Sequence, residues 1–196
     1  MKRGQSVSYE TLNRAFCDVQ NELEELGVYS GTKLTRVNVY WCKWPQLHIP
    51  SALGFFTETQ VTRLESWAGY ETGHIYIPRV VPLQFWKQNR GSLRAVLRHE
   101  FGHVIAHHLP STVRTRAFRS IFGGPHGWQE RDADQPDEAF VSDYAATCPA
   151  EDFAETFAHF VTYRRSHGTR GYHPKLRAKL QYVAKMIKRL ARGRKR

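Results

Sequence analysis

Residues 92–110 read SLRAVLRHEFGHVIAHHLP, and apolar residues recur through them at helical spacing. Ser92 is a suitable N-cap and Pro110 a suitable stop, so we predict a helix between them. On a helix, four residues advance about 400°, so the imidazoles of His99 and His103 leave one face a turn apart and can hold one metal ion. Glu100 lies about 100° round from His99, where it can accept a proton from a water on that ion.

The segment His99-Glu100-Phe101-Gly102-His103 fits the HExxH pattern of zinc hydrolases, a pattern that can also occur by chance. A catalytic zinc needs three protein ligands and an open position, so another segment must supply the third ligand. The metzincin continuation is absent, because Ala106 and Leu109 stand where its glycine and third histidine belong. His107 lies about 80° from His99, and we interpret it as near the site or solvent-facing rather than as a ligand.

A second helix is predicted from Pro149, which suits a first helical turn, towards Gly168. Glu151 and Glu155 lie four residues apart and project from one face of it. Carboxylates beside apolar residues repel each other unless a cation or hydrogen-bond donors lie there. The alternative is a solvated acidic face at a helix N-terminus, which the helix dipole also favours.

These two segments together resemble the gluzincin-type peptidases related to the catalytic domain of anthrax lethal factor and to the secreted Pro-Pro endopeptidases. In that group, HExxH is followed, several tens of residues later, by a helix with a zinc-binding glutamate and a second glutamate four residues on. A tyrosine lies seven residues before the ligand. Here these positions are filled by Glu151, Glu155 and Tyr144.

The resemblance implies one Zn²⁺ per chain, held by His99, His103 and Glu151. It further implies that Glu155 accepts the N–H of a ligand imidazole and that Tyr144 stabilises the oxyanion. Both roles are physically reasonable, because metal-bound histidines need an outer partner and a phenol can donate to developing negative charge.

The composition is that of a globular chain: 196 residues, 41% hydrophobic and 13% aromatic. We expect residues 1–196 to form a single zincin-like domain of α+β class, with a small N-terminal sheet, a zinc-binding helix and a helical C-terminal half. No apolar run approaches a membrane span and no hydrophobic leader segment is seen at the N-terminus, so a cytoplasmic location is expected. Cys17, Cys42 and Cys148 lack CxxC spacing and are expected to be reduced, with Cys148 a buried filler.

Before the zinc helix we predict a helix over residues 8–26, stopped by Gly27, and strands at residues 37–41, 60–64 and 74–77. In zincins the strand before the active helix commonly pairs with an extended substrate. Residues 73–78 resemble that strand, and Pro78 suits an edge. Ile75 and Tyr76 are therefore candidate substrate-binding residues.

After the zinc helix we predict a short helix capped by Ser111 that packs through Val113, Ala117, Phe118 and Ile121. A polar loop follows over about residues 123–136, and it either shapes the cleft or is an idle excursion.

The last predicted helix and tail, residues 174–196, carry an apolar stripe and a basic face. The chain has 29 Lys and Arg against 18 Asp and Glu, a net charge of +11. Such an excess attracts nucleic acid, anionic surfaces or acidic protein. No motif that reads a nucleic-acid groove is recognised, so two alternatives remain for the basic tail: non-specific association with polyanions, or a role in solubility alone.

The function predicted from these features is that of a zinc-dependent endopeptidase, in which Glu100 is the general base for a zinc-activated water that hydrolyses peptide bonds. The alternative is a regulatory or DNA-associated metallopeptidase-like module of narrow specificity, of the phage-immunity and radiation-response kind. A structural zinc site is disfavoured, since HExxH plus one glutamate leaves a coordination position open.

Overall fold

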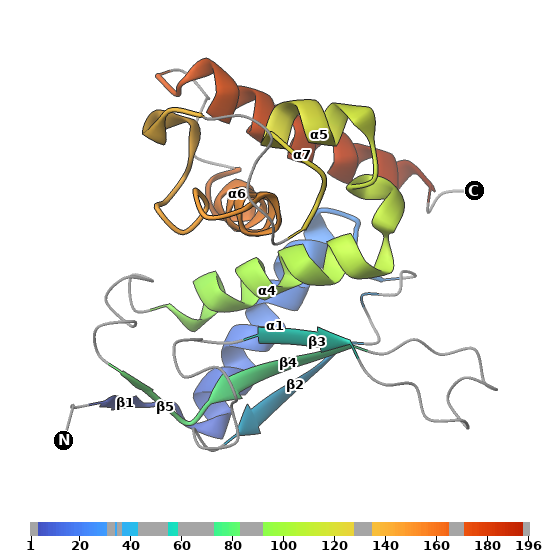
Figure 1. Cartoon of the computed structure of the whole chain (residues 1–196). Coiled ribbons are helices and arrows are strands. Elements are labelled where there is room, and N and C mark those ends of the chain that lie inside the picture. The colour runs from blue at the N-terminus through green and yellow to red at the C-terminus, as the bar shows by residue number, and fades with distance from the viewer. Residues whose placement is uncertain are drawn as a thin grey trace.

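The computed structural model describes residues 4–30, 34, 37–42, 55–58, 73–82, 92–127, 135–164 and 171–193. Helix α4 (Leu93–His108) lies between a small sheet with α1 (Tyr9–Glu25) on one side and the C-terminal helices on the other (Figure 1). Those helices are α5 (Arg116–Phe122), α6 (Pro149–Tyr163) and α7 (Pro174–Gly193). The arrangement agrees with the predicted α+β class and places α4 at the centre of the molecule.

The main sheet has the strand order β2-β4-β3. Strand β2 (Val37–Cys42) is parallel to β4 (Gly73–Pro78), and β3 (Phe55–Glu58) is antiparallel to β4. A separate antiparallel pair joins β1 (Gly4–Ser6) to β5 (Val80–Pro82). The predicted strands at 37–41 and 74–77 are confirmed, and the one at 60–64 lies outside the described residues.

Strand β4 is a central strand, so the prediction that it forms an edge is wrong. Residues 73–76 pair with β3 on one side, and residues 73–78 pair with β2 on the other. An extended substrate therefore has no free backbone edge to join at Ile75 or Tyr76. The side chain of Ile75 is fully buried in the core and is not available to a substrate either.

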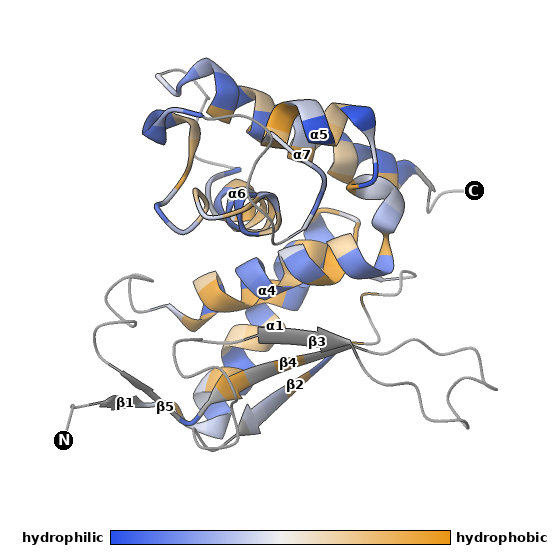
Figure 2. Cartoon of the chain, viewed as in Figure 1, coloured by the Kyte–Doolittle hydropathy of each residue, from blue (hydrophilic) through white to orange (hydrophobic). Residues whose placement is uncertain are grey.

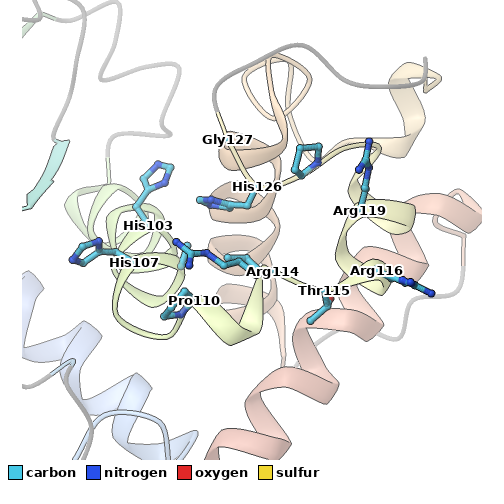
Figure 3. Close-up of a pocket in the computed structure, with 12 residues that line it drawn as sticks. His103, His107, Pro110, Arg114, Thr115, Arg116, Arg119, His126 and Gly127 are labelled. Atoms are coloured by element: carbon cyan, nitrogen blue, oxygen red, sulfur yellow. The ribbon is translucent and has the colours of Figure 1, made fainter.

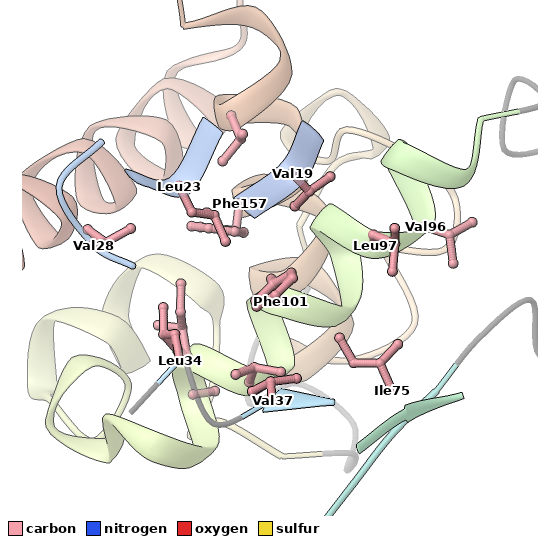
Figure 4. Close-up of a cluster of buried hydrophobic side chains, with 14 of the residues drawn as sticks. Val19, Leu23, Val28, Leu34, Val37, Ile75, Val96, Leu97, Phe101 and Phe157 are labelled. Carbon is pink, nitrogen blue, oxygen red and sulfur yellow. The ribbon is translucent and has the colours of Figure 1, made fainter. Parts of the chain in front are cut away.

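Helix α1 forms where the sequence predicts it. The Ser8 side chain accepts a hydrogen bond from the Thr11 amide, and Gly27 follows the helix with φ 71°, a conformation that favours glycine. Its buried face, with Val19 and Leu23, packs on α4 near Phe101 (Figure 4). The rings of Phe16 and Phe101 stack with centroids 6.1 Å apart. The apolar periodicity of this segment thus produces a layer behind α4.

Helix α4 is capped as predicted by Ser92, whose side chain accepts a hydrogen bond from the Ala95 amide. Apolar residues recur along its whole length (Figure 2), because it packs against elements on several sides. Arg98 donates two hydrogen bonds, of 2.7 and 2.6 Å, to the carboxylate of Glu22 on α1. A paired guanidinium of this kind fixes the rotation of α4 against α1.

The segment after α4 differs from the prediction. Ser111 lies in the 3₁₀ turn η3 (Pro110–Thr112), and the following helix α5 is capped instead by Thr115, whose side chain accepts from the Phe118 amide. Within α5, Phe118 is buried as expected, whereas Ala117 is exposed. The predicted loop at 123–136 is described only at 123–127 and 135–136.

Helices α6 and α7 start at Pro149 and Pro174, as the sequence predicts. Helix α7 buries its apolar stripe against α5 and α6 and leaves its basic residues exposed, with one exception. Lys179 lies within the apolar stripe and has no exposed surface. No helix in the described part of the chain is long and apolar enough to cross a membrane.

Candidate metal centre

His99 and His103 lie on the face of α4 that is turned towards α6. Their ring planes are 79° apart, with centroids separated by 4.8 Å, and their Nε2 atoms are 3.1 Å apart. One helical turn thus brings two possible metal-ligating nitrogens together, as the HExxH spacing predicts.

A glycine in the motif allows α6 to cross α4 at short range. A Cβ atom added at Gly102 would lie 2.7 Å from Ala154 Cα and 3.1 Å from Ala154 Cβ, both on α6. Only a residue without a side chain fits there. Gly102 therefore brings the acidic face of α6 up to the two histidines, a role that the sequence analysis did not assign.

Glu151 points between the two imidazoles. Its Oε2 atom is 3.1 Å from His99 Nε2 and 3.4 Å from His103 Nε2. The residue is 4% exposed, and its Oε2 atom is buried with no hydrogen-bond partner among the described residues. A buried carboxylate oxygen in this state normally has a cation or donor beside it.

The three atoms fit a metal ion. A tetrahedral zinc with bonds of about 2.05 Å holds its ligand atoms roughly 3.3 Å apart, close to the separations found here. His99, His103 and Glu151 also form a group able to hold a metal by the mutual proximity of their ligand atoms. Two imidazoles and a carboxylate are a ligand set that zinc commonly takes in catalytic sites.

Glu155 holds the outer side of His99. Its Oε1 atom is 2.7 Å from His99 Nδ1, and its Oε2 accepts a 2.8 Å hydrogen bond from Ser142 Oγ. With Nδ1 protonated towards Glu155, Nε2 keeps its lone pair for a metal. This is the geometry expected for Glu155, whereas Ser142 was missed, because nothing in its local sequence marks it.

Tyr144 contacts the third carboxylate from the open side. Its hydroxyl donates a 2.8 Å hydrogen bond to Glu151 Oε1, and its side chain remains 53% exposed. Burial, followed by the charge of Glu151, raises the pKa of Tyr144 above its ordinary value, so the phenol stays protonated. The donor predicted for the oxyanion thus lies at the site and is engaged by a candidate ligand.

In the metal-free site, the surrounding carboxylates favour the protonated form of His99. Burial lowers the pKa of His99, but the contacts with Glu151 and Glu155 and the charge of Glu100 outweigh it and raise that pKa to about 10. Burial raises the pKa of Glu151, and the two imidazoles bring it well below its usual range. The site is therefore built for positive charge.

Glu100, the predicted base, is buried at 4% exposure on α4. Its charge raises the pKa values of both His99 and Tyr144, which places it close to the two. His107 is not in the metal-binding group and lines a cleft beside His103 instead. Cys148 is buried at the N-cap of α6 and is not in a disulfide.

A second buried charge cluster was missed by the sequence analysis. Lys179 Nζ lies 2.8 Å from Asp152 Oδ2, donates a 2.8 Å hydrogen bond to the Ala139 carbonyl and lies 3.9 Å from the centroid of the Phe140 ring. The pair ties α6 and α7 to the segment that carries Ser142 and Tyr144. A lysine in the apolar stripe of α7 was the available signal.

Residues 84–172 match a family whose model is described as "Putative zinc-binding metallo-peptidase". This match supports a relationship of the chain to zinc metallopeptidases in general. The matched region contains HExxH on α4 and both glutamates on α6, so the metallopeptidase match covers the residues that the structure brings together. The comparisons with curated proteins and with solved structures gave no match.

Proposed function

We propose that this protein is a zinc-dependent endopeptidase of zincin-like architecture, formed by one domain over residues 1–196 and similar in its site to the lethal factor and Pro-Pro endopeptidase group. The observation that carries the proposal is the buried Glu151 Oε2, which has no hydrogen-bond partner in the described part of the chain and faces the Nε2 atoms of His99 and His103. The family match agrees with the metal and with the reaction class.

In the proposed mechanism, some residues would hold the metal ion and others would transfer protons. His99, His103 and Glu151 would hold zinc, and Glu155 orients His99 through its Nδ1. When bound, zinc supplies a Lewis acid that polarises a carbonyl and acidifies water. Glu100 accepts the proton of the attacking water and returns it to the leaving amine.

Tyr144 supplies the donor for the oxyanion in this mechanism. Its hydroxyl is bound to Glu151 Oε1 at 2.8 Å, so it must exchange that acceptor for the substrate oxygen as negative charge develops. The exposed position of its ring leaves room for this movement. A hydroxyl that is protonated over the physiological range suits the role.

The proposal is tested by Glu100→Gln, with Glu138→Gln as the matched control at an exposed carboxylate. General acid–base catalysis contributes about 10²–10⁴-fold, so we expect peptide hydrolysis to fall by that factor in Glu100→Gln. Zinc content should stay near one per chain, because the base is not a ligand. Normal turnover in Glu100→Gln would refute the assignment.

The basic face of α7 supports a second role beside catalysis. Lys185, Lys188, Arg189 and Arg192 are all exposed on this helix. Their charge favours non-specific association with DNA or other polyanions, which fits a module of narrow specificity that acts near nucleic acid. Salt-sensitive DNA binding without peptide cleavage, measured at two salt concentrations, would favour that module over a general endopeptidase.

A further inference from the structure

A cleft opens beside His103, on the side of the metal centre that leads towards α5. It has a volume of about 820 Å³ and is enclosed by the C-terminal half of α4, the segment through η3 into α5, and residues 125–127 (Figure 3). Because one candidate zinc ligand lines it, a peptide cleaved at the metal would place a side chain or its end in this cleft.

The described walls of the cleft are strongly basic. Arg114, Arg116 and Arg119 all line it, and no aspartate or glutamate is found among its described lining residues. Arg114 has no acidic partner in the described part of the chain, although its side chain points back towards α4 (Figure 3). Arg116 points away from His103 in the same view.

His126 forms the wall next to Arg114 and brings a ring nitrogen for which the described residues offer no hydrogen-bond partner. Its ring is directed towards His103 (Figure 3), and its Nε2 atom is buried without a hydrogen bond. Burial, and then the charges of His103 and Arg114, lower its pKa to about 4, so the ring is neutral at pH 7. The inner end of the cleft thus holds one guanidinium and one neutral imidazole.

We infer that this cleft binds a carboxylate of the peptide substrate, with Arg114 as the principal contact and His126 as a second one. A guanidinium presents paired N–H donors that match the two oxygens of a carboxylate. The inference rests on the proposed peptidase function and names the substrate class of that site. The carboxylate belongs either to an acidic side chain or to the C-terminus of the peptide.

A matched peptide series separates these two sources. In the first set every peptide has an amidated C-terminus, and glutamate is compared with glutamine at one position at a time, over three positions on either side of the cleaved bond. In the second set, two peptides that carry only glutamine differ in having a free or an amidated C-terminus. Charge-assisted hydrogen bonds support a preference of about tenfold in kcat/KM for the acid at one position. A preference for the free C-terminus alone would assign the cleft to the chain end.

In the variant Arg114→Gln, the ratio of kcat/KM for the acid peptide to kcat/KM for the amide peptide should fall to about one. Arg114→Lys should retain only part of the preference, because lysine cannot pair with both oxygens of a carboxylate. Arg116→Gln is the matched control from the same cleft and should keep the wild-type ratio. Zinc content and thermal midpoint establish that each variant is folded.

The same peptides are also tested for binding by fluorescence anisotropy, on zinc-loaded Glu100→Gln with and without Arg114→Gln. If the acid peptide binds more tightly only when Arg114 is present, and the wild type does not hydrolyse it, the peptidase proposal is refuted and the inference that the cleft binds a carboxylate is supported. Hydrolysis with no acid or C-terminal preference, or a preference that Arg114→Gln leaves intact, would overturn the inference about the cleft while leaving the peptidase proposal standing.

Discussion

Glu151 and Asp152 are neighbouring buried carboxylates at the start of α6. They differ in their partners, which are a lysine for Asp152 and two imidazoles for Glu151. Asp152 is paired with Lys179 at 2.8 Å and also accepts a 3.3 Å hydrogen bond from Thr156 Oγ1. The Oε1 atom of Glu151 accepts a hydrogen bond from Tyr144, and its Oε2 atom faces two imidazole nitrogens.

The difference separates a structural charge from a functional one. The Asp152 carboxylate finds its countercharge inside the protein, so it joins elements and needs nothing further. The Glu151 carboxylate is buried beside two other potential ligand atoms, where a metal ion could take the place of the proton that His99 holds in the metal-free site. Adjacent residues on one helix turn would thus serve folding, through Asp152, and the proposed metal binding, through Glu151.

The largest expected effect comes from breaking the Asp152 pair. Asp152→Asn leaves the buried ammonium of Lys179 without its countercharge, and the free energy of unfolding of the metal-free protein should fall by about 3–5 kcal/mol. Urea denaturation monitored by circular dichroism measures this. The double variant Asp152→Leu with Lys179→Met should recover most of the loss, and a single variant as stable as wild type would remove the structural role.

The variant Glu151→Gln should show the opposite pattern. Outer partners of zinc ligands are worth about 10–100-fold in affinity, so loss of a ligand should weaken zinc binding by more than about a hundredfold. Unfolding of the metal-free protein should change much less than in Asp152→Asn. Chelator competition measures the affinity, and unchanged zinc affinity would contradict the ligand assignment.

Gly102→Ala tests whether the close approach of α4 and α6 positions both acidic residues. The added Cβ would meet Ala154 Cα at 2.7 Å, and such overpacking costs about 1–3 kcal/mol of unfolding free energy, less the small gain in helix propensity. Zinc affinity should fall as well. Adding Ala154→Gly should not restore either property, because the backbone of residue 154 would still lie too close; full recovery in this double variant would contradict the explanation.

The smallest expected effect belongs to Glu155→Gln, which acts on the metal only through His99. Zinc affinity should fall by about tenfold, because the amide holds Nδ1 less strongly than the carboxylate does. Chelator competition at fixed pH measures it, with Glu138→Gln as the control. A loss as large as that of Glu151→Gln would mean that the ligand assignments of the two glutamates are wrong.

The parts of the fold that follow local rules were predictable from the sequence. The helices α1, α4, α6 and α7 are marked by caps, prolines and apolar spacing, which depend only on neighbouring residues. The facing positions of His99 and His103 follow from helical geometry alone. The convergence with Glu151 was expected from the resemblance and not from local pattern.

The rest depends on contacts between distant segments. The central place of β4 is decided by its pairing with β3, a four-residue strand in a separate segment of the chain. The close crossing at Gly102 needs Ala154 on another helix, and the partners of Lys179 come from α6 and residues 139–140. A glycine inside a helix and a lysine in an apolar stripe were visible signals, but neither names its partner.

The central claim is that one zinc joins His99, His103 and Glu151. Anomalous diffraction at the zinc edge from crystals of the zinc-loaded protein tests it most directly. We predict one zinc per chain, about 2.0–2.2 Å from both Nε2 atoms and from a carboxylate oxygen of Glu151. Zinc bound at other residues, or bound by the two histidines with the Glu151 carboxylate turned away, would contradict the account.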